Sequence, residues 1–256
     1  MTAEFLSTDL FAGLPHGFFT RRGGVSKGGF ATLNCSLSGQ DDAAAVATNR
    51  ARAMDALGLP GGALSSAHQV HGVAVAVVGQ PIPNEVRPTA DALVTDRPGL
   101  ALGVVTADCG PVLFADMEAG VVGAAHAGWR GAVAGILEET LLAMERLGAS
   151  RHAITAVVGP CIRQDSYEVG NDLRDAVLAR EAADSRFFVA GRREAHWQFD
   201  LAGYCAARLV AARTGRVAVI PADTCAEPDR FFSHRRRTLA GEGPIGHQLS
   251  AIALPA

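Results

Sequence analysis

The chain has 256 residues, of which 48% are hydrophobic and 19% are charged, a composition typical of a folded globular protein and unlike that of a disordered one. The formal net charge of −3 at pH 7 offers no long-range attraction for nucleic acid or for an anionic membrane surface, so neither partner is expected. The first residues lack the basic start and apolar core of a secretory signal, and no uncharged stretch is long enough to span a bilayer, so we expect a cytoplasmic protein.

The amino-terminal half of the sequence predicts one helix followed by short strands. Asp41 or Asp42 can cap the helix, and Gly58 and Pro60 are expected to stop it. Its apolar face would consist of Val46, Ala53, Met54 and Leu57. Apolar runs then predict three strands, at residues 73–79, 90–96 and 100–108.

The carboxyl-terminal half alternates strands and helices. A strand over 121–125 leads through a glycine-rich turn into a helix that ends at Gly148, with an inward face of Ile136, Leu137, Leu141 and Met144. Further strands are expected within residues 153–161 and 217–225. Between them, Asp200 can cap a helix whose apolar side carries Leu201, Tyr204, Cys205 and Leu209. Because no linker or repeat interrupts this order, we expect one domain over residues 1–256, with sheets covered by helices.

Three residues of metal-binding type lie beside glycines at predicted strand ends. His71, Cys109 and His126 offer two imidazoles and one thiolate, a set that suits a catalytic zinc with an open fourth position. The five cysteines of the chain are odd in number and widely spaced, which favours free thiols or a metal ligand over disulfides. A Gly110–Pro111 break after Cys109 is expected to turn the chain away and leave one side open. Spacing alone leaves the alternative of ordinary core or turn residues, because the three lie tens of residues apart.

Several motifs, taken together, resemble one protein family. They are QVHG at 69–72, the TADC-containing stretch 90–116, HAGWRG within 122–131, VGPCI at 158–162, FFSHRR at 231–236, FFTRRGGVS at 18–26 and NCSLS at 34–38. This set is similar to the multicopper polyphenol oxidases or laccase-domain proteins, a family more recently regarded as purine nucleoside phosphorylases. The resemblance implies that His71, Cys109 and His126 are zinc ligands. It also implies an α+β fold, a single compact domain with mixed sheets sandwiched between helices in α-β-β-α layers.

The resemblance implies two reactions on purine nucleosides. One is cleavage by phosphate of adenosine, inosine, guanosine or methylthioadenosine to the base and a ribose 1-phosphate type of sugar. The other is hydrolytic deamination of adenosine. The implied partners are purine nucleosides and phosphate, and the implied assembly is a monomer or a weak homodimer.

Copper-dependent polyphenol oxidation is the activity that the older family name suggests. The chain has only eight histidines and no HxH pair, whereas several coppers need many imidazoles. A site with two histidines and one cysteine can still bind copper, since copper(II) exceeds zinc in affinity for most such ligand sets. We therefore expect Zn²⁺, with copper possible.

The predicted catalytic residues are Asp108 and Arg21, and the predicted substrate-binding residues are Arg22, Arg130 and Cys161. Asp108 is a candidate proton carrier, but it can equally cap the turn or orient a metal-bound histidine. The arginines can bind phosphate or be solvated surface charges, and Cys161 can line the pocket or be a buried structural thiol.

Four further residues have an open role. His68 is expected to be an ordinary hydrogen-bonded histidine, and Trp129 a core or pocket-wall residue. His234 and His247 stand where the family often shows tyrosine and arginine, so their roles stay undefined.

Two other functions remain open on the same residues. Cys109 could be the nucleophile of an amide hydrolase that edits cell-wall precursor peptides, with His71 or His126 as base. A metal-stabilised binding protein without catalytic activity is the third class.

Overall fold

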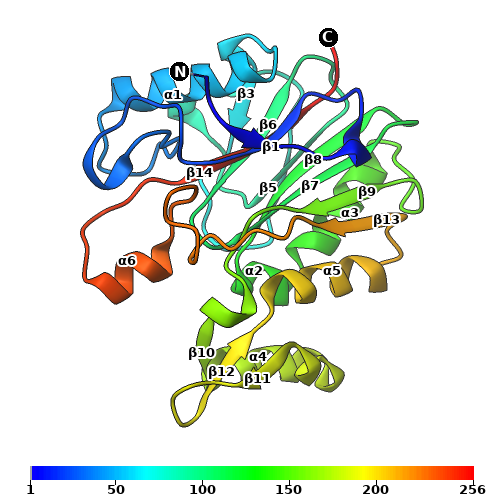
Figure 1. The fold of residues 1–256 in the computed structure, drawn as a ribbon. Helices are drawn as coiled ribbons and strands as arrows, with labels where there is room; N and C mark the ends of the chain where they lie inside the picture. Colours follow the sequence, from blue (N-terminus) through cyan, green and yellow to red (C-terminus); the bar gives the residue numbers. More distant parts are fainter. Residues whose placement is uncertain (1) are drawn as a thin grey trace.

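Two β-sheets stack face to face at the centre of the computed structural model, which describes residues 2–256 (Figure 1). The five-stranded sheet has the order β1 (Phe5–Leu6), β2 (His16–Phe19), β14 (Gln248–Ala253), β6 (Ala101–Thr106) and β3 (Leu64–Ser66). The six-stranded sheet has the order β13 (Arg216–Val219), β9 (Thr155–Val158), β7 (Gly110–Asp116), β8 (Val121–Ala127), β5 (Ala92–Thr95) and β4 (Val75–Val77). Both sheets mix parallel and antiparallel pairs.

Helices cover the outer face of each sheet. On the five-stranded sheet lies α1 (Ala43–Ala56), and on the six-stranded sheet lie α2 (Trp129–Ala134), α3 (Ile136–Arg146) and α5 (Leu201–Ala211) (Figure 1). Three clusters of buried apolar side chains fill the spaces between the layers, one under α1, one between the sheets and one under α3 and α5. The predicted α+β fold, a single compact domain in α-β-β-α layers, is confirmed.

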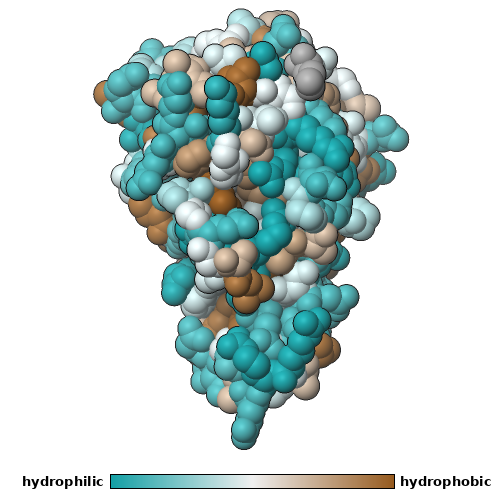
Figure 2. Space-filling model, turned by 60° about the vertical axis from the view of Figure 1, so that its left-hand side comes forward, coloured by the Kyte–Doolittle hydropathy of each residue, from teal (hydrophilic) through white to brown (hydrophobic). Residues whose placement is uncertain are grey.

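A small lobe and one short helix lie outside these layers. The lobe contains α4 (Asn171–Arg180) and a three-stranded sheet of β10 (Glu168–Gly170), β12 (His196–Phe199) and β11 (Phe188–Ala190). It forms the narrow lower end of the molecule (Figures 1 and 2). The short helix, α6 (His234–Ala240), lies beside the two sheets.

Short 3-10 turns connect many of these elements. They are Asp9–Phe11, Gly28–Phe30, Gly61–Ala63, Asn84–Val86, Gln164–Ser166 and Ala182–Phe187. Within residues 2–256, no helix has the length and apolar character needed to cross a bilayer.

The predicted helix starts at Asp42 and Asp200 are confirmed, whereas one predicted break is misplaced and one observed break was not predicted. Asp42 accepts a hydrogen bond from the backbone of the first turn of α1, and Asp200 does the same for α5. Gly110 and Pro111 do not end a strand but begin β7, because Asp108, at φ 90°, already reverses the chain between the two sheets. The helix expected after the glycine-rich turn is divided into α2 and α3 at Gly135, whose φ of 111° is incompatible with a continuous helix.

Candidate metal centre

Three separate segments bring His71, Cys109 and His126 together at one end of the sheets. His71 lies on the loop between β3 and β4, Cys109 on the link between β6 and β7, and His126 near the end of β8. In the antiparallel pairing of β7 with β8, Pro111 lies opposite His126, so the residue before β7 is delivered beside that histidine. The sheet register therefore places the thiol next to the imidazole.

The geometry of these three side chains fits a metal ion. Their ligand atoms all lie within 4.8 Å of one another, and His71 Nε2 is 3.9 Å from Cys109 Sγ. Zinc bonds of about 2.0 to 2.3 Å at tetrahedral angles place ligand atoms roughly 3.3 to 3.7 Å apart, so only a small contraction is needed. A Cβ on Gly128 would lie 2.9 Å from the His71 ring and 3.0 Å from the Cys109 sulfur, so glycine is required there. No other cluster of three or more possible ligands occurs among residues 2–256.

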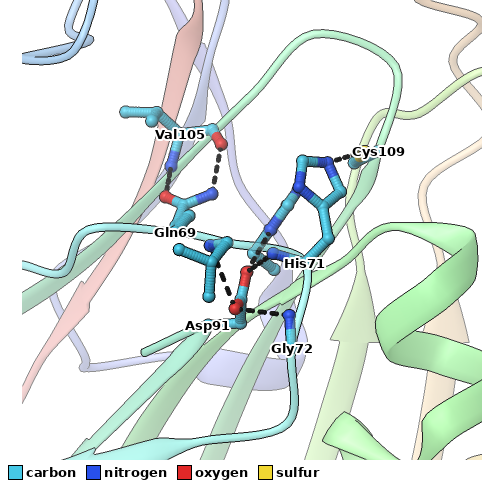
Figure 3. Close-up of polar contacts among 8 residues, drawn as sticks. Gln69, His71, Gly72, Asp91, Val105 and Cys109 are labelled. Carbon is cyan, nitrogen blue, oxygen red and sulfur yellow. Dashed lines mark hydrogen bonds and ion pairs between the residues drawn. The ribbon is translucent and has the colours of Figure 1, made fainter. Parts of the chain in front are cut away.

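Asp91, which was not predicted from the sequence, holds two of the three candidate ligands in place (Figure 3). Its carboxylate accepts hydrogen bonds from the backbone N–H groups of Val70, His71 and Gly72 at 2.7 to 3.2 Å. It also bonds His126 Nδ1 at 2.8 Å, which leaves Nε2 of that ring available to a metal. The His71 backbone has a φ of 62°, and the Asp91 carboxylate secures this turn.

Gln69 fixes the same loop from its other side. Its side-chain amide pairs with the Val105 backbone in both directions, donating to the carbonyl at 2.8 Å and accepting from the N–H at 2.9 Å (Figure 3). The glutamine thus extends the hydrogen bonding of β6 to the loop that carries His71. This contact explains the first residue of the QVHG motif.

The electrostatics of the metal-free site favour a thiolate beside a charged imidazole. Burial acts to raise the pKa of Cys109, but the charge of His126 and hydrogen bonds from both histidines outweigh it and lower the pKa to about 6. Burial acts to lower the pKa of His126, but the Cys109 thiolate and the hydrogen bond to Asp91 raise it to about 9. The thiolate is the form that binds a metal.

A cavity of about 600 Å³ opens over these side chains. Three arginines, two aromatic residues and two further histidines are among its lining residues: Arg87, Arg130, Arg235, Trp129, Tyr167, His234 and His247. The guanidinium of Arg130 lies 4.4 Å from the Trp129 ring centre and forms no ion pair within the described chain. The cavity therefore combines a candidate metal position, positive charge and aromatic walls.

Asp108 also borders this cavity, but its carboxylate is fully engaged. One oxygen accepts from the Thr224 hydroxyl at 2.7 Å, and the other accepts from the Ser233 hydroxyl at 2.9 Å and the Arg235 backbone N–H at 2.6 Å. The side chain is buried, at 8% exposure. These contacts favour the positioning role over that of a proton carrier, because they fasten the start of α6 to the residue beside Cys109.

Three of the predicted site residues lie away from this cavity. The Arg21 guanidinium donates to the carbonyls of Ala31 and Pro228 and faces a second cavity. Arg22 donates to the Asp229 carbonyl and pairs with a surface carboxylate, and Cys161 is fully buried in the core. Ile162, the neighbour of Cys161, lines the metal cavity instead. The motif spacing carried no information on which face of each turn is exposed.

The structure shows which of the remaining candidate residues line the metal cavity. Arg130 and Trp129 do line the cavity, as do His234 and His247, whereas His68 is exposed and is not part of the cavity wall. One ring nitrogen of His247, Nδ1, is buried without a hydrogen-bond partner among the described residues. Burial, together with the charges of His126 and His234, lowers the pKa of His247 to about 4, so this imidazole is neutral at pH 7.

Known proteins resemble this chain over nearly its whole length. A family model described as multi-copper polyphenol oxidoreductase laccase matches residues 15–255. Proteins named purine nucleoside phosphorylase from Deinococcus radiodurans and Mycobacterium tuberculosis are each 42% identical, covering 94% and 91% of this chain and 90% and 89% of their own.

Solved structures agree with the sequence relatives. A Neisseria meningitidis protein superposes with a TM-score of 0.86 at 33% identity, covering 100% of this chain and 99% of its own. YlmD from Geobacillus stearothermophilus gives a TM-score of 0.86 at 29% identity, covering 99% of this chain and 100% of its own. The family model, the sequence relatives and the solved structures all cover nearly the whole chain, including the candidate metal centre. The chain therefore belongs to the multi-copper polyphenol oxidoreductase laccase family.

Proposed function

We propose that this protein is a metal-dependent purine nucleoside phosphorylase. The observation that carries the proposal is the convergence of His71, Cys109 and His126 in a cavity that Arg130 also lines. Arg130 forms no ion pair with any of residues 2–256. Phosphorolysis requires a phosphate anion held beneath the sugar carbon, and positively charged groups hold such an anion. This cavity offers two of them, the Arg130 guanidinium and a position for a metal ion. The relatives named purine nucleoside phosphorylase support the same reaction class.

The proposed metal ligands are His71, Cys109 and His126, with Zn²⁺ as the expected ion. A divalent metal bound there supplies positive charge that polarises and orients an oxygen nucleophile. Asp91 keeps the Nε2 atom of His126 directed to the site, and Gln69 keeps the His71 loop against β6. The protein thus fixes the ligands before a metal or substrate arrives.

The proposed phosphate contacts are Arg130 and Arg235. Arg130 is held by the face of Trp129, and Arg235 donates to the Glu168 carbonyl at 2.7 Å while its guanidinium lies 5.4 Å from the Tyr167 ring centre. Stacking on aromatic faces orients a guanidinium without neutralising it. A cavity of about 600 Å³ falls within the range of roughly 300 to 1,000 Å³ that is usual for small-molecule sites, so it accommodates a nucleoside with phosphate.

The finer substrate assignment is adenosine, inosine, guanosine and methylthioadenosine, with deamination of adenosine as a second activity. Both reactions need an oxygen nucleophile, either phosphate or water, oriented in the same cavity. The reaction that takes place depends on whether phosphate or water occupies the position that faces the metal ligands.

Product analysis by mass spectrometry tests this proposal. The zinc-quantified protein is incubated with adenosine, with and without phosphate, beside Cys109→Ala and a matched Cys225→Ala control at a half-buried thiol outside the site. Adenine and ribose 1-phosphate are expected only with phosphate, inosine is expected without it, and neither is expected from Cys109→Ala. Absence of all three products at full zinc occupancy would overturn the proposal.

A second candidate, a cysteine-type amide hydrolase, is favoured by one observation. The Cys109 sulfur lies within 4.8 Å of a His126 ring nitrogen, and Asp91 binds Nδ1 of that ring, an order of groups that also activates nucleophilic cysteines. Metal ligation and nucleophilic attack exclude each other at the same sulfur. Turnover of a cell-wall precursor peptide by the zinc-free protein that is lost on full zinc loading would support the hydrolase, and absence of turnover in both the zinc-free and zinc-loaded forms would exclude it.

A further inference from the structure

A second cavity, of about 600 Å³, lies on the other side of α6 from the metal cavity. His234 and Arg235 line the metal cavity, whereas the next two residues of the same helix, Arg236 and Arg237, line the second one. Arg21 completes a set of three guanidinium groups on its wall. This concentration of charge is not used by the proposed reaction.

Hydrogen-bonded carboxylates do not neutralise the three guanidinium groups within the described chain. Arg21 and Arg236 donate to backbone carbonyls, which orient them but do not neutralise them. Within residues 2–256, none of the three forms an ion pair with a carboxylate. Burial and the charge of Arg236 lower the pKa of Arg21, while Asp229 and Glu242 act in the opposite direction. Arg21 and Arg236 therefore lie near enough to repel each other, and an anion between them would reduce this repulsion.

Arg237 supplies a donor that has no partner. Its Nε atom is buried and has no hydrogen bond in the described part of the chain, and an NH2 group lies 3.4 Å from His234 Nδ1. A buried donor without a partner costs free energy comparable to a lost hydrogen bond. An acceptor in the cavity would satisfy it.

The other lining residues define the kind of ligand. Glu242 offsets one of the three positive charges, and Pro228, Pro244 and Ile245 provide an apolar section of wall. The face that carries α6 is mostly hydrophilic, with hydrophobic residues scattered in small groups (Figure 2). These features suit a small polar molecule with a compact anionic end better than a protein partner.

We infer that the cavity formed by Arg21, Arg236 and Arg237 is a second anion-binding site that takes a phosphate group, either as free phosphate or as part of a sugar phosphate. The phosphate oxygens would accept from the guanidinium groups, since arginine matches phosphate geometry well. The apolar wall would contact the rest of a larger ligand. A ligand here would also hold α6, which forms a wall of the metal cavity. This inference does not depend on the reaction proposed for that cavity.

Equilibrium dialysis with radiolabelled inorganic phosphate and, separately, radiolabelled ribose 5-phosphate tests the site in the zinc-loaded protein. The variants are Arg237→Gln, the charge-retaining Arg237→Lys, and a matched Arg216→Gln control on the exposed edge strand β13. We expect two sites per chain in the wild type. Loss of one charge-assisted hydrogen bond weakens binding by about tenfold or more, so Arg237→Gln should weaken one site by this factor while Arg216→Gln changes neither.

The two probes distinguish the sources of the phosphate group. Equal affinity of the second site for the two probes indicates free phosphate as the ligand, and tighter binding of ribose 5-phosphate indicates a sugar phosphate. Either result supports the site if Arg237→Gln weakens or abolishes the binding. An Arg130→Gln variant should affect the other site, in the metal cavity. Identical binding by Arg237→Gln and Arg216→Gln with both probes would overturn the inference, as would a single site that responds only to Arg130→Gln.

Discussion

At the scale of single residues, Asp91 decides whether the candidate ligands can act together. One carboxylate receives three backbone N–H groups of the His71 loop and the imidazole of His126, so its removal frees both ligands at once. We predict that Asp91→Asn lowers metal affinity by roughly 10- to 100-fold, the usual effect of removing a partner of a ligating histidine. Titration with Co²⁺, followed by its visible absorption, measures this affinity.

The matched control for this prediction is Asp96→Asn. Asp96 lies just after β5, as Asp91 lies just before it, and its only ion pair is with the neighbouring Arg97 within the described chain. This variant should bind Co²⁺ as the wild type does. Equal affinity of the two variants would show that Asp91 is not needed to position the ligands.

The reactivity of Cys109 gives a second prediction at this scale. Its pKa of about 6 means that the thiolate of the metal-free protein forms as the pH rises through 6, well below the usual range for cysteine. The alkylation rate with iodoacetamide should therefore rise with a midpoint near pH 6 and stay high at pH 7. His126→Ala removes the main attracting charge and should move the midpoint upward.

Mass mapping of the alkylated protein distinguishes Cys109 from the other thiols. Burial raises the pKa values of the other four cysteines, including the half-buried Cys225, so they should react more slowly at pH 7. Zinc should protect Cys109. Alkylation of Cys109 at an unchanged rate in the presence of zinc would contradict its role as a ligand.

The sequence predicted the three candidate ligands but not the residue that organises them. His71, Cys109 and His126 follow from residue type and from motifs that resemble a family, and the structure brings them together. Asp91 stands in one of the quoted motifs, yet its bonding partners lie 19 to 35 residues further along or back. Such contacts depend on the sheet register, which the motifs do not contain.

At the scale of secondary-structure elements, α6 depends on Ser233, the N-cap residue that precedes it. The Ser233 hydroxyl accepts from the Arg236 N–H as a helix cap and donates to Asp108, so one side chain joins the helix to the turn beside Cys109. We predict that Ser233→Ala lowers the free energy of unfolding by about 1 to 2 kcal/mol, the effect of losing a cap together with a buried hydrogen bond. Urea denaturation measures it.

Thr238→Ala is the control on the same helix. Among the described residues, the exposed Thr238 hydroxyl bonds only to the His234 carbonyl within α6, so its loss should have a much smaller effect on stability. In amide hydrogen exchange, Ser233→Ala should increase exchange over residues 234–240, and Thr238→Ala should not. Similar exchange in both variants would show that Ser233 does not anchor the helix.

Hydrophobic periodicity predicted whether a segment is a helix or a strand, but it did not predict every point at which these elements begin or end. The caps at Asp42 and Asp200 are local signals and were found. The break at Gly135 was missed because glycine is compatible with both a helix interior and the left-handed region, and the apolar pattern continues through it. The start of β7 at Gly110 was missed because the reversal depends on the backbone conformation of Asp108.

At the scale of the whole molecule, the candidate metal centre lies at the rim of the core rather than inside it. The layers are held by three apolar clusters, and none of the three proposed ligands belongs to them. The alternation of apolar strands and helices predicted sheets covered by helices, whereas the α-β-β-α order of the layers was implied by the family resemblance. It follows that the fold should form without the metal, and that the metal should add stability by binding only the native state.

We therefore predict that zinc raises the melting temperature of the wild type and leaves that of Cys109→Ala and His71→Ala unchanged. A ligand at 100 times its Kd stabilises the native state by about 2.7 kcal/mol, and for a chain of this size such a gain corresponds to an increase of several degrees. Differential scanning calorimetry with zinc and with chelator measures the shift, and circular dichroism shows whether each variant is folded. Loss of the native spectrum on chelation would mean that the metal is required for folding, which the position of the site at the rim of the core argues against.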